Sequence, residues 1–493
     1  MKEVSSAQLR RIILASGIGT VIEWYDFFIF GSLAATVIGP QFFPKSDNPL
    51  VQTLEALATF AVGFVVRPFG ALVFGKLGDT VGRKYTFLVT LLLMGGSTFA
   101  VAFVPNYARI GVFAPILLVL LRLVQGLALG GEYGGATTYV AEHTPDTRRG
   151  FYTSLIQLTA TIGLVLSIGV IFTCRTLLSP DDFQDWGWRI PFMLSGLLVI
   201  VSYFIRQNMD ESPLFRQLKT TNTVSKNPLK ESFVNPQNRR LVLLTLFGLT
   251  AGYGCIWYTA HFYPSVFIGT IMHVDFLQTN QIMLVAIVLA TPFAVFFGSL
   301  SDKKTSAWIS RKKLMMTGLA LAALTFYPIY RHMAAAIDPA GKAVTQTTVN
   351  QRIEAGKAVR TETRMFADGS SEVITQLPDE PDSRPKTVIY LSSGSRNRLI
   401  VWVFIQVFIV AMAYGPIAAY LVELFPTRIR YTSLSLPYHI GNGIFGGLTP
   451  FIATALISST GNQFAGLLYP LGMAALTTLI GVFLLPESDG TIE

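Results

Sequence analysis

The sequence has few charged residues and almost no cysteine. Asp, Glu, Lys and Arg make up 14% of its 493 residues, against roughly 25% in soluble domains. Its two cysteines, Cys174 and Cys255, fall inside apolar runs, where we expect buried free thiols and no disulfide framework. The chain lacks an HExxH motif and any clustered His, Cys and Asp set. These absences exclude an ordinary soluble domain and predict no enzyme activity, metal or cofactor.

Long apolar runs are what the sequence has in quantity. Hydrophobic residues account for 51% of the chain, and a helix needs about 20 residues to cross a bilayer. The first run has no small-residue cleavage site, so it is a retained helix and not a signal peptide. The pattern predicts an all-α polytopic membrane protein with twelve transmembrane helices, at residues 12–39, 54–75, 85–104, 111–141, 151–178, 188–206, 240–269, 279–300, 313–331, 398–421, 432–458 and 463–485.

The net charge of +9 follows the predicted topology. With both termini in the cytosol, most Lys and Arg residues fall in cytosolic segments, as the positive-inside rule requires. The basic charge therefore indicates orientation and no nucleic-acid partner. We expect a multi-pass protein of the bacterial inner membrane, surrounded by lipid. The short external loops hold only Lys45, Arg109, Arg175 and Arg189.

A charged turn occurs at matching places in the two halves of the chain. Gly75-Lys-Leu-Gly-Asp79-Thr-Val-Gly82-Arg83-Lys84 follows the second run, and Gly298-Ser-Leu-Ser-Asp302-Lys-Lys follows the eighth. Glycine permits a tight turn, and an Asp can accept hydrogen bonds from a helix N-terminus. The repetition indicates a duplicated protein with two pseudo-symmetric six-helix halves. The expected gating residues in these turns are Gly75, Asp79, Gly82, Arg83, Lys84 and Asp302.

A second pair of matching turns follows the fourth and tenth runs. One copy is Glu142-His-Thr-Pro145 with Arg148-Arg149-Gly150, and the other is Glu423-Leu-Phe-Pro426 with Arg428-Ile-Arg430. The pair supports the same division into halves. Its expected gating residues are Glu142, Arg149, Glu423 and Arg428.

The second half contains an insertion. Its charges balance, and Asp368-Gly369 suits a tight turn between alternating strands over 361–375, so we expect a β-hairpin there. A small accessory module, a loop without function of its own and a lid over the cavity all stay open. The predicted segments are an N-terminal half at 1–206, a cytosolic loop at 207–239, a C-terminal half at 240–331 and 398–493, and an external insertion at 332–397.

Asp, Glu, Lys and Arg residues deep inside the predicted spans are confined to the first half. Such groups are costly in a bilayer and face the bundle interior. Their signs nearly cancel, which suggests mutual pairing, and Asp26 falls near mid-membrane. Arg122 and Gln125 share one helix face with Glu132. The five ionisable residues are Glu23, Asp26, Arg67, Arg122 and Glu132.

A carboxylate in such a place can couple transport to protons. Desolvation raises its pKa and a nearby arginine lowers it, so its protonation can change as a cavity opens to either side. Arginine stays charged throughout. We therefore expect Asp26 with Arg122 to couple protons, with Glu23, Arg67 and Glu132 as further candidates. A permanent buried ion pair that locks two helices is the alternative.

The first charged turn and the motifs around the five buried charges resemble those of the metabolite:proton symporters of the major facilitator superfamily. The resemblance covers about 1–330 and 398–490 and leaves out the insertion. It implies a carrier of small organic acids, such as dicarboxylates, citrate and shikimate, or of zwitterions such as proline and betaine. Asp26 and Arg122 match the proton-coupling Asp and its Arg partner in the related sugar:proton symporters. Besides the first charged turn, it rests on Gly19-Thr-Val-Ile-Glu23-Trp-Tyr-Asp26-Phe, Arg67-Pro68-Phe-Gly70, Arg122-Leu-Val-Gln125-Gly126 and Gly130-Gly-Glu132-Tyr-Gly-Gly.

The second half offers polar and aromatic groups in place of deep charges. Tyr253, Trp257 and His261 share a helix face at i, i+4 and i+8, which suits a cavity lining. A packing stripe or an interfacial aromatic belt is the alternative. The substrate-cavity candidates of both halves are Tyr25, Gln125, Tyr133, Gln157, Tyr253, Trp257, His261, Gln406, Tyr414, His439 and Asn442.

The predicted function is import of a small metabolite by proton symport through alternating access, by a protein that works as a monomer. A proton-driven exporter of the same fold stays open, because the sequence does not give the direction of transport. A non-transporting nutrient sensor would need a signalling domain, and the cytosolic segments are too short for one.

Overall fold

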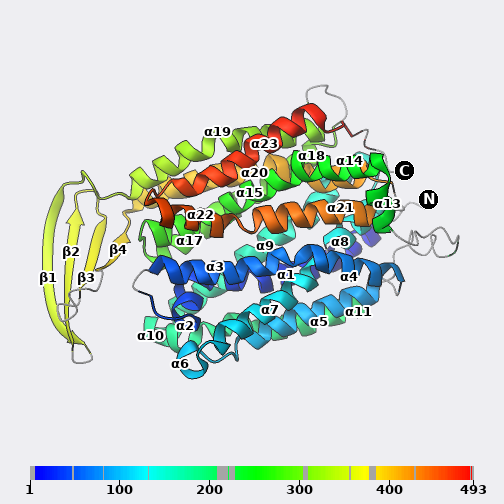
Figure 1. Cartoon of the computed structure of the whole chain (residues 1–493). Helices are drawn as coiled ribbons and strands as arrows, with labels where there is room; N and C mark the ends of the chain where they lie inside the picture. The colour runs from blue at the N-terminus through cyan, green and yellow to red at the C-terminus, as the bar shows by residue number, and fades with distance from the viewer. Residues whose placement is uncertain are drawn as a thin grey trace.

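The molecule is a long bundle of helices with a small β-sheet at one end (Figure 1). The chain termini lie at the opposite end. We call these the sheet end and the terminal end. The computed structural model describes residues 6–46, 49–80, 83–131, 133–207, 220, 228–303, 309–354, 357–376, 385–426, 429–488 and 490.

Helices of the first half form one side of the bundle, and short helical turns join them at the sheet end (Figure 1). The long elements are α1 (Ser6–Leu33), α3 (Pro49–Val65), α4 (Arg67–Thr80), α5 (Arg83–Val101), α7 (Phe113–Gly130), α8 (Tyr133–His143), α9 (Arg149–Leu177) and α11 (Arg189–Gln207). The short ones at the sheet end are η1 (Ala34–Ile38), α2 (Gly39–Phe42), α6 (Tyr107–Ile110), α10 (Pro180–Asp182) and η3 (Phe183–Gly187), and η2 (Asp146–Arg148) joins α8 to α9 at the opposite end.

The second half repeats this arrangement. Its helical columns, by which we mean consecutive helices that run end to end along the bundle, have more breaks. Pro292, for example, directly follows the break between α17 and α18, because proline cannot donate to the preceding turn. The elements are α13 (Pro228–Val234), α14 (Pro236–Thr245), η4 (Leu246–Thr250), α15 (Ala251–His261), α16 (Tyr263–Ser265), η5 (Val266–Ile271), α17 (Phe276–Ala290), α18 (Pro292–Leu300), α19 (Arg311–Ile337), α20 (Ser393–Leu424), α21 (Arg430–Tyr438), η6 (His439–Gly446), α22 (Thr449–Thr460), η7 (Ala465–Leu467) and α23 (Leu468–Leu484).

Most of the helical columns are long and apolar enough to cross a membrane. Within the described residues, ten segments meet this condition, and an eleventh does so if Pro180–Gly187 and Arg189–Phe204, bent by 48°, form one span. The remaining predicted span, at 85–104, corresponds to a shorter apolar helix at Leu88–Val101. The predicted helical polytopic fold is confirmed.

The connection between α19 and α20 is a four-stranded antiparallel sheet in the order β1-β2-β3-β4. Thr361 and Thr375 are register partners in the β2–β3 hairpin. Burial alone would raise the pKa of Asp368 at its turn, but hydrogen bonds from Ser370 and the charge of Lys342 hold it at about 2. The strands are β1 (Val344–Glu354), β2 (Lys357–Phe366), β3 (Ser371–Gln376) and β4 (Lys386–Tyr390).

The flanking helices extend further into the insertion than predicted. The boundaries 332–397 are wrong, because α19 continues to Ile337 and α20 begins at Ser393. The imidazole of His332 stacks on Trp402, with ring centroids 5.1 Å apart. Packing between α19 and α20 thus continues past residue 331, where the hydrophobic pattern alone indicates the end of the ninth apolar run.

Strand β4 fixes the sheet to the second half. The Ile389 N–H donates to the His273 carbonyl at 2.8 Å, and the Asp275 N–H donates to the Ile389 carbonyl at 2.9 Å. The Leu391 N–H donates to Gln278 Oε1 at 2.7 Å. His273 has a φ of 59°, which side-chain-bearing residues rarely adopt. These backbone bonds hold β4 against the chain just before α17.

The two halves meet along two seams. Helix α9 packs against α17, α18 and α20, and α3, α4 and α8 pack against α21, η6 and α22. Both seams bring residues far apart in sequence to the centre of the bundle. The site candidates lie between them.

Candidate functional site

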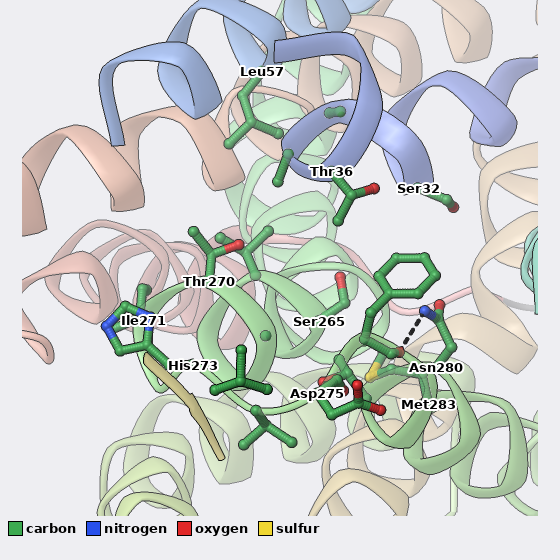
Figure 2. A pocket seen from close by; sticks show the side chains of 18 of the residues that line it. Ser32, Thr36, Leu57, Ser265, Thr270, Ile271, His273, Asp275, Asn280 and Met283 are labelled. Atoms are coloured by element: carbon green, nitrogen blue, oxygen red, sulfur yellow. Dashed lines mark hydrogen bonds between the residues drawn. The ribbon is translucent and has the colours of Figure 1, made fainter. Parts of the chain in front are cut away.

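A cavity of about 1260 Å³ lies between the halves near the sheet end (Figure 2). Ser32 and Thr36 of the first half line it opposite Ser265 and Asp275 of the second. Strand β4 contributes to the wall as well. Its lining there consists of Lys386, Thr387, Val388 and Tyr390.

Aromatic side chains from both halves meet on the side of this cavity nearer the terminal end. Phe60 stacks on Phe262 with ring centroids 5.2 Å apart, and Phe28 stacks on Trp257 at 5.8 Å. Phe64 meets Tyr258 edge-on at 5.1 Å. Such contacts gain about 0.5–1.5 kcal/mol each beyond area burial. They join the two halves between the cavity and the centre of the bundle.

The centre of the bundle holds polar aromatic residues from both halves. Tyr133 of α8 lies parallel to Tyr438 of α21, with ring centroids 3.5 Å apart. His439 meets both rings edge-on. The Tyr414 hydroxyl donates to the carbonyl of Gln157 on α9. We call Tyr133, Gln157, Tyr253, Trp257, Tyr414, Tyr438 and His439 the central group.

Several buried polar atoms of the central group have no hydrogen-bond partner among the described residues. Such orphaned groups are uncommon in folded proteins, and each indicates a role such as binding a solute or water. They come from both halves of the chain. The atoms are Tyr133 Oη, Gln157 Nε2, Trp257 Nε1 and both ring nitrogens of His439.

Other predicted cavity residues lie in or beside the packing between helices. The Tyr25 hydroxyl donates to the Pro191 carbonyl at 2.9 Å, inside the first half. Gln406 donates to Met333 Sδ at 3.3 Å, between α20 and α19. Their assignment to the cavity is wrong, because a helix packed on several sides buries more than one face. His261 lines the cavity near the sheet end, which we call the outer cavity.

Asn442 stays close to the centre. A Cβ added to Gly254 would lie 2.9 Å from the Asn442 side-chain oxygen, so this amide packs on α15. Gln125 instead donates to Thr98 Oγ1 at 2.9 Å and accepts from Arg122 Nη1. It therefore holds Arg122 in place, inside the first half.

Arg122 is fully buried among aromatic rings. Its guanidinium carbon lies 4.2 Å from the ring centroid of Phe27 and 4.7 Å from that of Phe30. Arg67 is held in the same way, 4.3 Å from the ring centroid of Phe64. A cation over an aromatic face gains about 2 kcal/mol when it is desolvated. Among the described residues, these rings contact the two buried arginines, and neither arginine forms an ion pair with a carboxylate.

Asp26 faces a different side of α1. A Cβ added to Gly95 of α5 would lie 3.4 Å from Asp26 Oδ2, and within the described residues neither carboxylate oxygen has a hydrogen-bond partner. The predicted pairing of Asp26 with Arg122 is therefore wrong for this conformation. The Phe27 carbonyl accepts from Arg122, and successive helix residues are about 100° apart, so Asp26 turns away.

The remaining charge candidates are less well defined. Glu23 is buried on the same helix as Asp26. Gly75 and Asp79 lie within α4, and Arg83 and Lys84 open α5. The positions of Gly82, Glu132 and Arg428 lie outside the described residues.

Ion pairs join the halves at the terminal end. Glu423, which is fully buried, accepts from Arg149 Nη1 at 2.9 Å and from Arg311 Nε at 2.9 Å. Asp302 pairs with Arg311 at 3.0 Å. Its two oxygens also accept from the N–H groups of Gly150 and Phe151 in the first turn of α9. The carboxylates of the second half thus bind the start of a first-half helix.

A second contact at this end joins Glu142 to Arg430 at 3.4 Å. Arg430 also donates to the carbonyls of Val422 and Phe425, which closes the turn after α20. Arg311 and Arg430 were missing from the predicted gating residues. Arg430 belongs to the second pair of matching turns, and its place in that turn was the signal that could have found it.

The helices α9 and α18 touch at the terminal end. A Cβ at Gly150 would lie 2.4 Å from the Gly298 carbonyl oxygen, so the backbones meet there without room for a side chain. This close contact and the ion pairs close the bundle at its terminal end. The outer cavity lies toward its other end.

Gly150→Val should open the terminal end, because the valine methyls would push α18 away. We expect a cysteine at Ser435, in a background without Cys174 and Cys255, to react faster with maleimide applied from the terminal side. Gly169→Val on the same helix is the matched control, since nothing lies within 4 Å of a Cβ there. Equal rates in the two variants would contradict the close contact.

Comparison with known proteins identifies the family of this chain. The model of the sugar (and other) transporter family matches residues 12–242 and 385–491. The chain belongs to this family of the major facilitator superfamily. The protein is therefore a multi-pass membrane transporter and not an enzyme.

Its relatives share most of its length. The inner membrane metabolite transport protein YhjE of Escherichia coli (strain K12) is 32% identical over 97% of this chain and 94% of its own. The glycine betaine/proline/ectoine/pipecolic acid transporter OusA of Dickeya dadantii is 30% identical over 98% of this chain and 84% of its own. The xylose transporter XylE of E. coli, in a partially occluded inward-open conformation, shares the fold with a TM-score of 0.66. It is 17% identical over 99% of this chain and 100% of its own.

Proposed function

We propose that this transporter imports a small metabolite together with protons by alternating access. The observation that carries the proposal is the central group, whose unpartnered polar atoms come from both halves. Ion pairs close the terminal side of this group, and a cavity lies on its other side. A substrate bound between two halves that rock against each other gains access to one side at a time.

The orientation we propose puts the terminal end in the cytosol. The loops at that end carry most of the basic residues, which agrees with the positive-inside rule. YhjE is named as an inner membrane protein, and we place this chain in the same kind of membrane. The outer cavity then faces outward, so this conformation accepts substrate from outside.

The substrate we propose is an organic acid or a zwitterionic osmolyte or amino acid. Aromatic faces such as that of Trp24 attract cations, and the Arg67 guanidinium, 4.9 Å from the Trp24 ring centroid, can meet a carboxylate. OusA is named for substrates that carry both charges, and XylE is named a proton:xylose symporter. Each chain contains both halves of the site, which supports function as a monomer.

Asp26 is the proton carrier we propose. A charged carboxylate without a partner is costly to bury, so this residue favours the protonated form in a closed, dry environment. Arg122 and Arg67 stay charged among their aromatic neighbours and do not carry the proton. Glu23 and Glu132 stay proton-coupling candidates.

Uptake into proteoliposomes tests the proposal. A panel of labelled organic acids and zwitterions is offered with and without an inward proton gradient. We expect one substrate to accumulate only with the gradient. We also expect protons to enter the liposomes together with that substrate. Accumulation that is independent of the gradient would contradict proton symport, and uphill movement opposite to the proton flow would favour the proton-driven exporter.

Replacing residues 339–391 with a short Gly/Ser linker should weaken substrate capture. The sheet contributes a wall of the outer cavity, which favours the lid over a module without a part in transport. We expect a rise of about two- to tenfold in apparent KM with little change in kcat. Removing only the β1–β2 tip at 352–359 is the control, because the β2–β3 pairs and β4 then remain. An unchanged apparent KM at normal membrane abundance would instead support an accessory module without a part in transport.

A further inference from the structure

Two neighbouring helical columns carry opposite charges at both of their ends. Helix α9 begins at Arg149 and has Arg175 in its last turn. The column of α17 and α18 packs against it in the opposite direction, between Asp275 and Asp302. Each end of the pair therefore has an arginine from the first half and an aspartate from the second.

At the terminal end, the charged residues of both columns are bonded to partners in the other half. Asp302 accepts from the first turn of α9, and Arg149 pairs with Glu423. At the sheet end, Arg175 and Asp275 line the same cavity from opposite halves. Among the described residues, neither takes part in an ion pair there.

The Arg175 side chain reaches the residue next to Asp275. The Arg175 guanidinium carbon lies 5.9 Å from the ring centroid of Phe276, which follows Asp275 directly. Arg175 Nη1 donates to the Pro180 carbonyl at 3.1 Å, so its contacts are with an exposed carbonyl and rings. Closer approach of the two helices would move the Arg175 charge toward the Asp275 carboxylate.

Asp275 is the fixed partner. Its side chain caps α17 by accepting from the Gln278 N–H at 3.1 Å, and its own N–H is bound to β4. Burial, and then the Asp275 charge, raise the pKa of Tyr390 on that strand. The sheet and the helix thus hold the carboxylate at the cavity wall, while the long Arg175 side chain is held by one exposed carbonyl and by aromatic rings.

We propose that Arg175 and Asp275 are an outer latch, which pairs when the outer cavity closes. The proposal rests on the alternating access proposed above. Closure removes water from the cavity, and an ion pair strengthens as the local dielectric falls. Formation of the latch then offsets the loss of the ion pairs at the terminal end, so the two conformations stay close in free energy.

Charge removal with the helix cap retained tests the latch. Asp275→Asn keeps a good N-cap residue and removes only the charge. Arg175→Gln removes the other charge, and Arg109→Gln is the control for an exposed arginine at the same end. In cysteine-free protein, Ser265→Cys reports access from the sheet side and Ser435→Cys from the terminal side.

Each single variant should label about two- to fivefold faster at position 265 and slower at 435, the range expected for a partly exposed ion pair. The double variant should equal either single variant, because each removes the same interaction. Additive effects, or rates equal to those of Arg109→Gln, would overturn the latch. Labelling is done without a proton gradient. If the wild-type rates at the two positions do not change in opposite directions with substrate, alternating access itself fails.

Discussion

Asp26→Asn should abolish proton-driven accumulation while substrate exchange across the membrane continues. Asparagine has the shape of a protonated Asp26 and cannot release a proton, so the carrier can still reorient with substrate. An inward gradient of one pH unit supplies about 1.4 kcal/mol per proton, enough for roughly tenfold accumulation. We expect that accumulation to fall to an inside-to-outside ratio of about one.

The measurement compares two assays on the same proteoliposomes. Counterflow of labelled against unlabelled substrate should keep a rate within a fewfold of the wild type. Asp181→Asn is the control, because Asp181 is an exposed acid at the sheet end. Tenfold accumulation by Asp26→Asn would exclude this residue as the proton carrier and leave Glu23 and Glu132 as the candidates.

Glu423→Gln should shift the transporter strongly toward an open terminal end. Glu423 is fully buried and is the shared partner of Arg149 and Arg311. Removing one member of a buried ion pair costs about 3–5 kcal/mol, because the remaining charges are left without compensation. When the terminal end opens, water solvates these arginines, so the cost falls mainly on the closed conformation.

We expect labelling of Ser435→Cys from the terminal side to rise at least tenfold, and labelling of Ser265→Cys from the sheet side to fall. Glu487→Gln is the control, since Glu487 is exposed at the same end. Glu423→Asp should recover part of the closed population. If Glu423→Gln labels like Glu487→Gln, these ion pairs do not set the conformational balance.

Long-range features followed from the sequence because they depend on simple physical requirements. A bilayer demands long apolar helices, so the spans could be read from hydrophobicity. The repeated charged turns indicated the duplication, and Asp302 and Glu423 indeed lie between the halves. The Asp368-Gly369 turn placed the β2–β3 hairpin because few residues other than glycine adopt its backbone angles.

The sequence did not predict which partners the buried polar and charged groups have. Asp26 and Arg122 have opposite charges, yet Arg122 contacts Phe27, Phe30 and the Gln125 amide. Opposite sign predicts attraction but not which side of a helix faces which neighbour. Tyr25 and Gln406 were misplaced for the same reason, since a polar residue in an apolar helix can bond to any of several adjacent helices.

The sequence by itself determined that this protein is a helical membrane transporter of two related halves, because apolar length, charge distribution and repetition are properties of the chain. Only the tertiary structure decided which groups meet. The pairing of Tyr133 with Tyr438, the bond of Asp302 to α9 and the contribution of β4 to the cavity wall all join distant segments. Such contacts depend on the rotation and depth of each packed helix, which the periodicity of a single helix leaves undefined.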